Sequence, residues 1–188
     1  MGQRHLIPYT EYFQQENGLM LSKEKFSKFY PGFIEDEIYK KIHALTPVLC
    51  HDAILNYNGK ALVAYRDGRP AKGVLSPLGG ALKKGLSLED SLRKKIRQES
   101  GLEIDALKQL GITRVVWEDD PFDHGKGTDS FVFMYYGIGK GDLKLESLSN
   151  PLLISPKEYT NEFRNSLHPY TRDFLDVVID IMSENKTH

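Results

Sequence analysis

The sequence predicts one layered α/β domain within its 188 residues. The first observation is a pair of helical segments. Residues 88–100 carry helix start and stop signals, and a second helix from about Pro169 has the apolar stripe Phe174, Val177, Val178, Ile181 and Met182. The second observation is a set of apolar runs of strand length on both sides of the first helix. Strands mixed with two substantial helices bury their apolar faces in stacked layers, which gives the α/β class.

The expected strands begin with the apolar run from Pro47 to Asn56. Asn58-Gly59 follows as a two-residue hairpin signal, and Ala61–Arg66 then alternates as a strand does. A turn with the sequence DGRPAKG (67–73) leads to Val74–Leu78 and then to Gly79-Gly80. After the helix, further strands are expected at Val115–Trp117, Phe131–Gly137 and Leu152–Ile154. A polar, glycine-bearing loop over 119–128 connects the first two of them.

The first 45 residues differ from the rest in composition and in their interruptions by proline and glycine. We expect short helices at Ser22–Tyr30 and Glu35–Leu45. Residues 1–45 are therefore predicted to be an extension that packs on a domain spanning 46–188. The aromatic side chains of this extension have two interpretations: they cover the core or a dimer surface, or they form an interaction module. They are Tyr9, Tyr12, Phe13, Phe26, Phe29 and Tyr30.

Composition excludes some classes of function. The net charge of −1 argues against a general electrostatic hold on nucleic acid or on an acidic membrane, which needs a basic surplus. The single cysteine, Cys50, cannot form an intrachain disulfide and fits a reducing compartment. We expect it to be a small buried core residue. No signal-peptide pattern and no apolar run of about 20 residues is present, so a cytoplasmic location is expected.

The helix at 88–100 has one unusual residue on its apolar face. Ser87 with Asp90 forms a capping box, and Gly101 is a C-terminal stop signal. Leu88, Leu92, Ile96 and Glu99 fall within an arc of about 80°. Glu99 is either solvated at the domain rim or paired with Lys95, or it points inward as a metal ligand. In the second interpretation, a carbonyl of Gly79-Gly80, the glutamate and phosphate oxygens form a shell for Mg²⁺.

The stretch from Gly79 to Leu102 resembles the Nudix box, G-x5-E-x7-R-E-U-x-E-E-x-G-U. Gly80, Glu99, Gly101 and Leu102 match this pattern at the right spacing. Other box positions depart from it: Leu86 stands for a glutamate, Lys94-Lys95 for Arg-Glu, and Gln98 for the first glutamate of the pair. The resemblance implies the Nudix fold, a mixed β-sheet sandwiched between helices in an α/β/α arrangement.

The resemblance extends to one branch, the GDP-mannose mannosyl hydrolases, which break the sugar C1 bond. It covers roughly residues 40–180 and runs through TPVLCHDAIL, NGKALVAYRDGRPAKG, PLGG, the Gly127–Asp129 triplet and LHPYTRDFL at 167–175. It implies a nucleotide-linked small-molecule substrate and a Mg²⁺ cofactor, with Mn²⁺ as the alternative metal. The charge and the lack of a long apolar run predict neither nucleic acid nor a membrane as partner. The resemblance does not determine the oligomeric state, and a homodimer is one of the alternatives.

Carried over position by position, the resemblance implies a set of site residues. Asp52 and Arg66 are catalytic, with Arg66 meeting the diphosphate and its departing charge. The Gly79 carbonyl and the Glu99 carboxylate are metal ligands. Substrate contacts are assigned to Arg69, Lys94, Thr128 and Tyr135; Lys94 keeps the charge of a family arginine but not its fork, and Ala81 replaces a second family arginine.

The family's Gln-His pair, which supplies a metal ligand and the general base, aligns with Ser147-Leu148 here. The usual base is therefore missing. Glu146 is the nearest carboxylate, and the loop WEDDPFDHGKG offers His124 with Asp119, Asp120 and Asp123 as substitutes. His168 is expected to cap or pack the last helix.

Two hypotheses about function follow. The first is a Mg²⁺-dependent hydrolase of a nucleoside diphosphate-linked substrate, with a nucleotide sugar as the preferred class and either the sugar C1–O bond or the diphosphate as the bond broken. The second is a catalytically inactive Nudix-like domain that binds a nucleotide sugar or related metabolite, which the losses at Leu86, Lys95, Gln98 and Leu148 favour.

Overall fold

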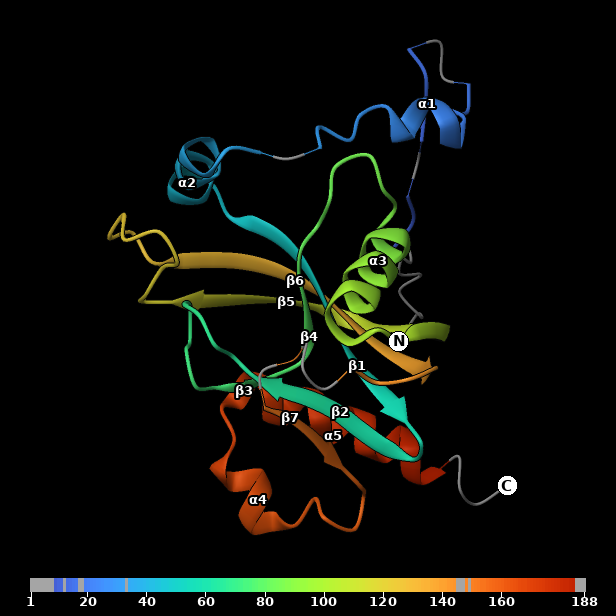
Figure 1. The fold of residues 1–188 in the computed structure, drawn as a ribbon, viewed down its shortest axis with the longest axis vertical. Helices are drawn as coiled ribbons and strands as arrows, with labels where there is room; N and C mark the ends of the chain where they lie inside the picture. Colours follow the sequence, from blue (N-terminus) through green and yellow to red (C-terminus); the bar gives the residue numbers. More distant parts are fainter. Residues whose placement is uncertain are drawn as a thin grey trace, which may run out of the picture.

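The computed structural model describes residues 9–11, 13–16, 19–32, 34–144, 148 and 150–184. The helices are α1 (Lys23–Ser27), α2 (Asp36–Leu45), α3 (Leu88–Ser100), α4 (Asn161–Ser166) and α5 (Pro169–Glu184). The strands are β1 (Val48–Tyr57), β2 (Lys60–Tyr65), β3 (Leu75–Ser76), β4 (Leu78–Ala81), β5 (Glu103–Trp117), β6 (Thr128–Lys140) and β7 (Pro151–Ile154). Figure 1 shows their arrangement.

The strands form one mixed sheet with β1 at its centre. The order is β3-β2-β1-β6-β5, and β4 and β7 join it on β1 and β2. β6 runs parallel to β1 along Val48–Asn56, whereas β4 and β2 are antiparallel to it. Because β6 occupies one edge of β1, β4 and β2 share the other: β4 pairs with Cys50–Ala53 and β2 with Leu55–Tyr57. β4 and β2 therefore lie one after the other along the same edge of β1.

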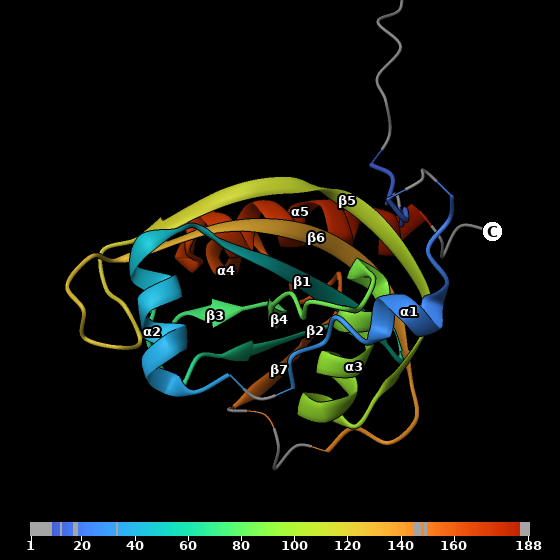
Figure 2. The same cartoon turned by 90° about the horizontal axis from the view of Figure 1, so that it is seen from above.

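Helices cover both faces of the sheet. α3 and α5 lie on opposite sides of the strands, as Figures 1 and 2 show. Leu92 and Ile96 of α3 pack with Leu55 on one face, and Phe174 and Val178 of α5 belong to the cluster on the other face. The predicted α/β/α layering is confirmed.

The capping signals of α3 act as the sequence predicts. The Ser87 hydroxyl accepts a hydrogen bond of 3.1 Å from the Asp90 backbone N–H. Gly101 ends the helix with φ of 75°, a left-handed conformation that favours glycine. These two ends fix which turn of α3 carries Lys95 and Glu99.

Other elements differ in extent from the prediction. β5 and β6 are much longer than the expected Val115–Trp117 and Phe131–Gly137, because they pair with each other along most of their length. β5 is an edge strand whose many polar side chains face solvent, so it lacks the apolar pattern on which the prediction depended. α1 is shorter than the expected Ser22–Tyr30, and α4 was not predicted.

Tyr9 and Glu11 of the N-terminal segment contact the sheet and the start of α3. The Tyr9 ring packs edge-on against Phe133 with 5.1 Å between centroids, and Phe13 packs on Phe26. The Glu11 carboxylate accepts a 3.0 Å bond from the backbone N–H of Leu88 at the start of α3. These aromatics cover other parts of the chain; Tyr12 lies outside the described residues.

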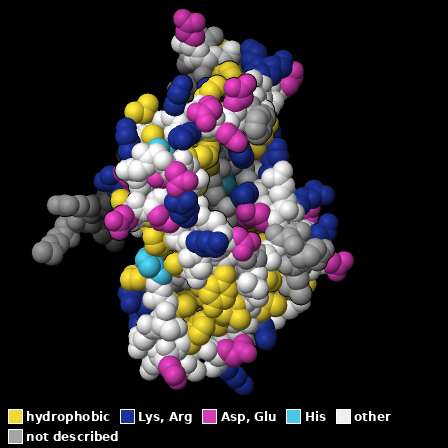
Figure 3. All heavy atoms as spheres, turned by 60° about the vertical axis from the view of Figure 1, so that its left-hand side comes forward, with side chains coloured by type: hydrophobic (Ala, Val, Ile, Leu, Met, Phe, Trp, Pro, Cys, Tyr) yellow, Lys and Arg dark blue, Asp and Glu magenta, His cyan; other side chains and the backbone are white. Residues whose placement is uncertain are grey.

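The charged side chains are of both signs over the surface. Lys and Arg alternate with Asp and Glu across the face in Figure 3, in keeping with the net charge of −1. Among the described residues, no helix combines the length and the apolar character needed to cross a bilayer.

Candidate functional site

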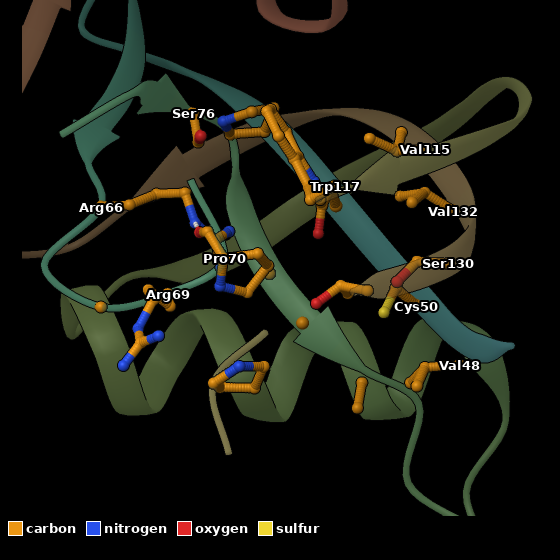
Figure 4. Close-up of a pocket in the computed structure, with 18 of the residues that line it drawn as sticks. Val48, Cys50, Arg66, Arg69, Pro70, Ser76, Val115, Trp117, Ser130 and Val132 are labelled. Atoms are coloured by element: carbon orange, nitrogen blue, oxygen red, sulfur yellow. Dashed lines mark hydrogen bonds between the residues drawn. The ribbon is translucent and has the colours of Figure 1, made fainter. Parts of the chain in front are cut away.

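A cavity of about 540 Å³ lies over the first half of β1, where β4 and β6 flank that strand. Alternate residues of β1, namely Val48, Cys50 and Asp52, line it, because successive strand side chains point to opposite faces. Figure 4 shows Val48 and Cys50 near Ser130 and Val132 of β6, with Arg66 and Pro70 on another wall and Trp117 between them. The 66–70 loop, β4, α2, α3 and the start of α5 complete the walls.

Asp52 is a partly buried acid in this cavity. Its Oδ2 accepts a hydrogen bond of 2.7 Å from the hydroxyl of Tyr170 at the start of α5. Burial raises the pKa of Asp52 to about 6, while the Tyr170 hydrogen bond and the charges of Arg66 and Lys95 oppose that rise. Burial and the Asp52 carboxylate both raise the pKa of Tyr170, so this hydroxyl stays protonated and donates. The site therefore holds a carboxyl group that titrates near neutral pH.

Gly79 lies beside Asp52 on the neighbouring strand. The two residues are register partners in the antiparallel β1–β4 pair. A Cβ on residue 79 would overlap the His51 carbonyl and Oδ1 of Asp52. Only glycine allows β4 to approach β1 this closely with the Asp52 side chain between them.

Arg66 and Arg69 belong to the loop that follows β2. The Arg66 Nε donates to the Pro70 carbonyl at 2.6 Å, and the Arg66 backbone pairs with Gly73 and Val74. Arg69 forms an ion pair with Asp123 at 2.6 Å. Both arginines line the cavity, which places two guanidinium groups on the wall nearest the loop.

A second loop holds the first in position. The Asp119 carboxylate accepts the Ala71 backbone N–H at 3.1 and 3.2 Å, and the Thr128 hydroxyl donates to the Asp119 carbonyl at 2.9 Å. Thr128 also lines the cavity. Asp119 thus connects the 66–70 loop, which we call the arginine loop, to the start of β6.

Glu99 and Lys95 enter the cavity together from α3. Their carboxylate and ammonium are 2.7 Å apart, one helical turn from each other, and both side chains are about two-thirds buried, at 29% and 34% exposure. Pairing of Glu99 with Lys95 was one of the two interpretations of this helix.

The donors around Glu99 do not fit a divalent cation. The carboxylate that would bind Mg²⁺ or Mn²⁺ is neutralised by an ammonium in direct contact. Among the described residues, no group of three or more His, Cys, Asp and Glu side chains is arranged to hold a metal ion. Among the described residues that line the cavity, the other oxygen ligands near Glu99 are the Asp52 carboxylate, which already accepts a hydrogen bond from Tyr170, and backbone carbonyls such as that of Gly79. Mg²⁺ and its relatives prefer several oxygens without a competing positive charge.

Several expected site residues lie elsewhere. Lys94 faces away from the cavity, its Nζ 4.8 Å from the centroid of the Tyr30 ring. Tyr135 lines a separate, smaller cavity with Tyr9 and Glu11. His124 is not among the cavity-lining residues; its Nε2 is 2.8 Å from Nδ1 of His43. Glu146 lies outside the described residues, as does Ser147.

The other acidic residues of the 119–128 loop have structural partners. Asp120 accepts three backbone N–H groups, from Phe122, His124 and Gly125, at 2.8 to 3.1 Å. Its carboxylate therefore closes the loop as an Asx-type turn does. His168 Nδ1 accepts the Tyr170 backbone N–H at 3.3 Å at the start of α5, which agrees with the capping role expected for it, and its ring stacks on Trp117 with 4.6 Å between centroids.

The lining residues that were not predicted as site residues include Tyr39, His43, Trp117 and Tyr170. Tyr39 and His43 come from α2, where both rings meet Phe122. The prediction for Cys50 is wrong in part. It is only half-buried and lines the cavity, because it shares a β1 face with Asp52. Burial still raises the pKa of its thiol to about 12, so it stays protonated.

Comparison with known proteins gives one relative by sequence. No family model matches the chain. The low-salt glycan biosynthesis protein Agl8 of Haloferax volcanii is 23% identical over 149 residues, which cover 77% of this chain and 90% of Agl8. This similarity spans nearly the whole of that protein.

Solved structures give the fold. A MutT NUDIX hydrolase from Burkholderia pseudomallei superposes with a TM-score of 0.55 at 16% identity, over 70% of this chain and 97% of that one. The NUDIX domain of Shewanella oneidensis NrtR, solved in complex with ADP-ribose, gives 0.52 at 16% identity over 82% and 100%. A NUDIX-family hydrolase from Clostridium perfringens gives 0.55 at 12% over 73% and 99%. With the sheet, its two helical layers and the cavity beside β1, these matches show that the chain has the Nudix fold.

Proposed function

We propose that the chain hydrolyses a small molecule linked to a nucleoside diphosphate, with a nucleotide sugar as the substrate class and the sugar C1–O bond as the bond broken. One observation carries the proposal. Asp52, with a pKa of about 6, is held by Tyr170 inside a cavity whose wall carries Arg66 and Arg69. A carboxylate with a raised pKa and a guanidinium in one cavity are suited to act as a base and to stabilise an anionic leaving group.

The proposed reaction uses Asp52 as the general base. Its carboxylate takes a proton from a water molecule as the water oxygen forms a bond to the sugar C1. The C1–O bond breaks, and the nucleoside diphosphate leaves with the electron pair and its negative charge. Arg66 stabilises that charge, which develops fully only as the bond breaks, and so it accelerates the chemical step.

Leu148 occupies the position of the histidine that acts as general base in the related family, so another residue must take that role. We assign the role to Asp52. The loop candidates His124 and Asp120 have other partners, as described above. Asp52 needs no rearrangement to face the cavity. Because its pKa lies near neutrality, it is ionised at pH 7 and still basic enough to accept a proton.

The comparisons are consistent with a nucleotide-linked ligand. Agl8 bears a name from glycan biosynthesis, and the NrtR domain was solved with ADP-ribose, which also joins a nucleoside diphosphate to a sugar. A cavity of about 540 Å³ lies in the usual range for small-molecule sites. No step of the proposed reaction passes through Mg²⁺ or Mn²⁺.

A product analysis tests the proposal. The protein is incubated with GDP-mannose, other nucleotide sugars, ADP-ribose and nucleoside triphosphates, with Mg²⁺ and with EDTA in parallel. Free sugar and intact nucleoside diphosphate are expected, with activity lost in Asp52→Asn and lowered roughly 100-fold in Arg66→Ala. Two monophosphate products would instead identify diphosphate cleavage and refute the choice of bond.

The alternative function is binding without turnover. Replacement of box carboxylates by Leu86, Lys95 and Gln98 favours it, since each removes a group that the family uses in catalysis. Thermal stabilisation by a nucleotide sugar, with no products from any substrate after long incubation, would support this function. Wild-type product formation that Asp52→Asn abolishes would exclude it.

A further inference from the structure

We propose that the ammonium of Lys95 takes the place of a divalent cation in this cavity, so that the diphosphate of the ligand binds without metal. The inference rests on the proposed function for the identity of the ligand. It goes further by assigning the cation. Lys95 was expected only as a possible partner of Glu99, and not as part of a ligand site.

The position of Lys95 is the first argument. Lys95 occupies the position at which the Nudix box has the glutamate that follows the arginine, four residues before Glu99. The substitution exchanges a negative charge for a positive one at a fixed point on α3. The new charge is held there by a 2.7 Å contact with Glu99, the box carboxylate that is left.

The surroundings of the ammonium are the second argument. Its Cε and Nζ lie 3.4 and 3.9 Å from the point where a Cβ on Gly80 would stand, so the side chain crosses the glycine pair of β4. Its charge also opposes the rise of the Asp52 pKa and lowers the pKa of His51, although burial is the largest influence on both. The ammonium therefore lies between α3 and β4, in the cavity that Asp52 also lines.

The third argument is the charge distribution of the cavity. The described residues that line it carry charges of both signs: the cations are Arg66, Arg69 and Lys95, and the carboxylates are Asp52, Asp67 and Glu99. Arg69 is paired with Asp123, and Arg66 uses its Nε for Pro70. Lys95 adds a compact charge with three N–H donors, of which Glu99 takes one, and an ammonium of this kind is an established ligand of phosphate oxygens.

A divalent cation at Glu99 would have to displace this ammonium or lie beside it. Neither is favourable, because the nearby groups supply too few oxygens to outweigh repulsion between two cations. The ammonium, in contrast, is part of the chain and needs no free ion. It offers phosphate oxygens the N–H donors that Glu99 does not take, and Arg66 supplies the cavity guanidinium that has no carboxylate partner among the ion pairs of the described residues.

The first experiment measures metal binding directly and needs no substrate. Mn²⁺ is titrated into wild-type protein, Lys95→Glu and Lys94→Glu, and free Mn²⁺ is followed by its electron paramagnetic resonance signal. Lys95→Glu restores a carboxylate beside Glu99 and should bind Mn²⁺ roughly tenfold or more tightly than wild type. Lys94→Glu changes the net charge equally but outside the cavity, and should match wild type. Equal Mn²⁺ affinity in wild type and Lys95→Glu would overturn the proposal.

The second experiment measures anion binding and covers the case in which Lys95→Glu does not fold. Inorganic pyrophosphate is titrated calorimetrically in EDTA into wild type, Lys95→Met and Lys95→Arg. Wild type should bind, Lys95→Met should lose roughly tenfold in affinity, and Lys95→Arg should recover much of it because the charge returns. Lys94→Met is the matched control and should bind as wild type does.

The outcomes separate this inference from the proposed function. Pyrophosphate binding in EDTA that depends on Lys95 supports the inference even if no nucleotide sugar is hydrolysed. Pyrophosphate binding that requires Mg²⁺ in wild type, or that is the same in Lys95→Met, overturns it whatever the products of turnover are.

Discussion

At the scale of single residues, Asp52 determines how the molecule responds to pH. Its pKa of about 6 in the folded chain exceeds the ordinary value near 3.9, so folding favours the protonated form. Its contribution to the free energy of unfolding is therefore largest below about pH 4 and is lost as pH rises through 6, by up to roughly 3 kcal/mol. Catalysis has the opposite dependence, since the base must be ionised: kcat/KM should rise through about pH 6. Urea unfolding and initial rates from pH 4 to 8 check both, and Asp52→Asn should remove the first dependence.

Tyr170 adjusts that pKa through one hydrogen bond. Its hydroxyl stabilises the ionised carboxylate, so Tyr170→Phe should move the acidic limb of the rate profile to higher pH. The matched control is Tyr159→Phe, which removes a hydroxyl bonded to Asp176 at 2.8 Å and leaves Asp52 untouched. A rate profile that Tyr170→Phe lowers at every pH without shifting would show that the hydroxyl does not act through Asp52.

Local signals in the sequence predict local structure well. The serine cap and Gly101 define α3, and the spacing of Lys95 and Glu99 indicates an ion pair because i and i+4 side chains meet on a helix. Alternation along β1 also indicates that Cys50 and Asp52 share a face. The alternation does not show which of the two faces lines a cavity, because that depends on where α5 packs. The prediction that Cys50 is a core residue is therefore wrong in part.

Long-range contacts are harder to predict. Tyr170 lies 118 residues from Asp52, and no local pattern links them. The parallel β1–β6 pair and the contribution of α2 to the cavity are set by how layers stack, which a single sequence does not encode in its periodicity. The assignments of Lys94 and Tyr135 came from the family resemblance alone, and neither residue lines this cavity.

At the scale of elements, Asp119 holds the arginine loop against the 119–128 loop. Asp119→Ala would leave the Ala71 N–H without its acceptor in a buried position, at a cost of about 1–3 kcal/mol, and would release Arg66 and Arg69. We expect a lower urea midpoint and weaker nucleotide-sugar binding. Asp123→Ala removes only a largely exposed ion pair with Arg69 and should cost less than about 1 kcal/mol. Equal losses in the two variants would show that the backbone bond is not the important one.

At the scale of the whole molecule, one helix joins the core to the site. α5 places Phe174, fully buried, against the sheet and Tyr170, one turn earlier, against Asp52. Loss of α5 packing should therefore disrupt the site and the core together. Phe174→Ala is expected to cost about 3–5 kcal/mol, and Val177→Ala on the exposed side of the same helix less than about 1 kcal/mol.

The single tryptophan makes this coupling measurable. Trp117 lines the cavity, so its fluorescence reports on the site, whereas circular dichroism reports on all helices and strands. If α5, sheet and cavity form one cooperative unit, both signals should give the same urea midpoint in wild type and the same lowered midpoint in Phe174→Ala. A fluorescence change that precedes the loss of circular dichroism would mean that the cavity opens before the sheet unfolds. In that case ligand affinity would be lost in Phe174→Ala under conditions in which the chain is still folded, and the site would be the least stable part of the fold.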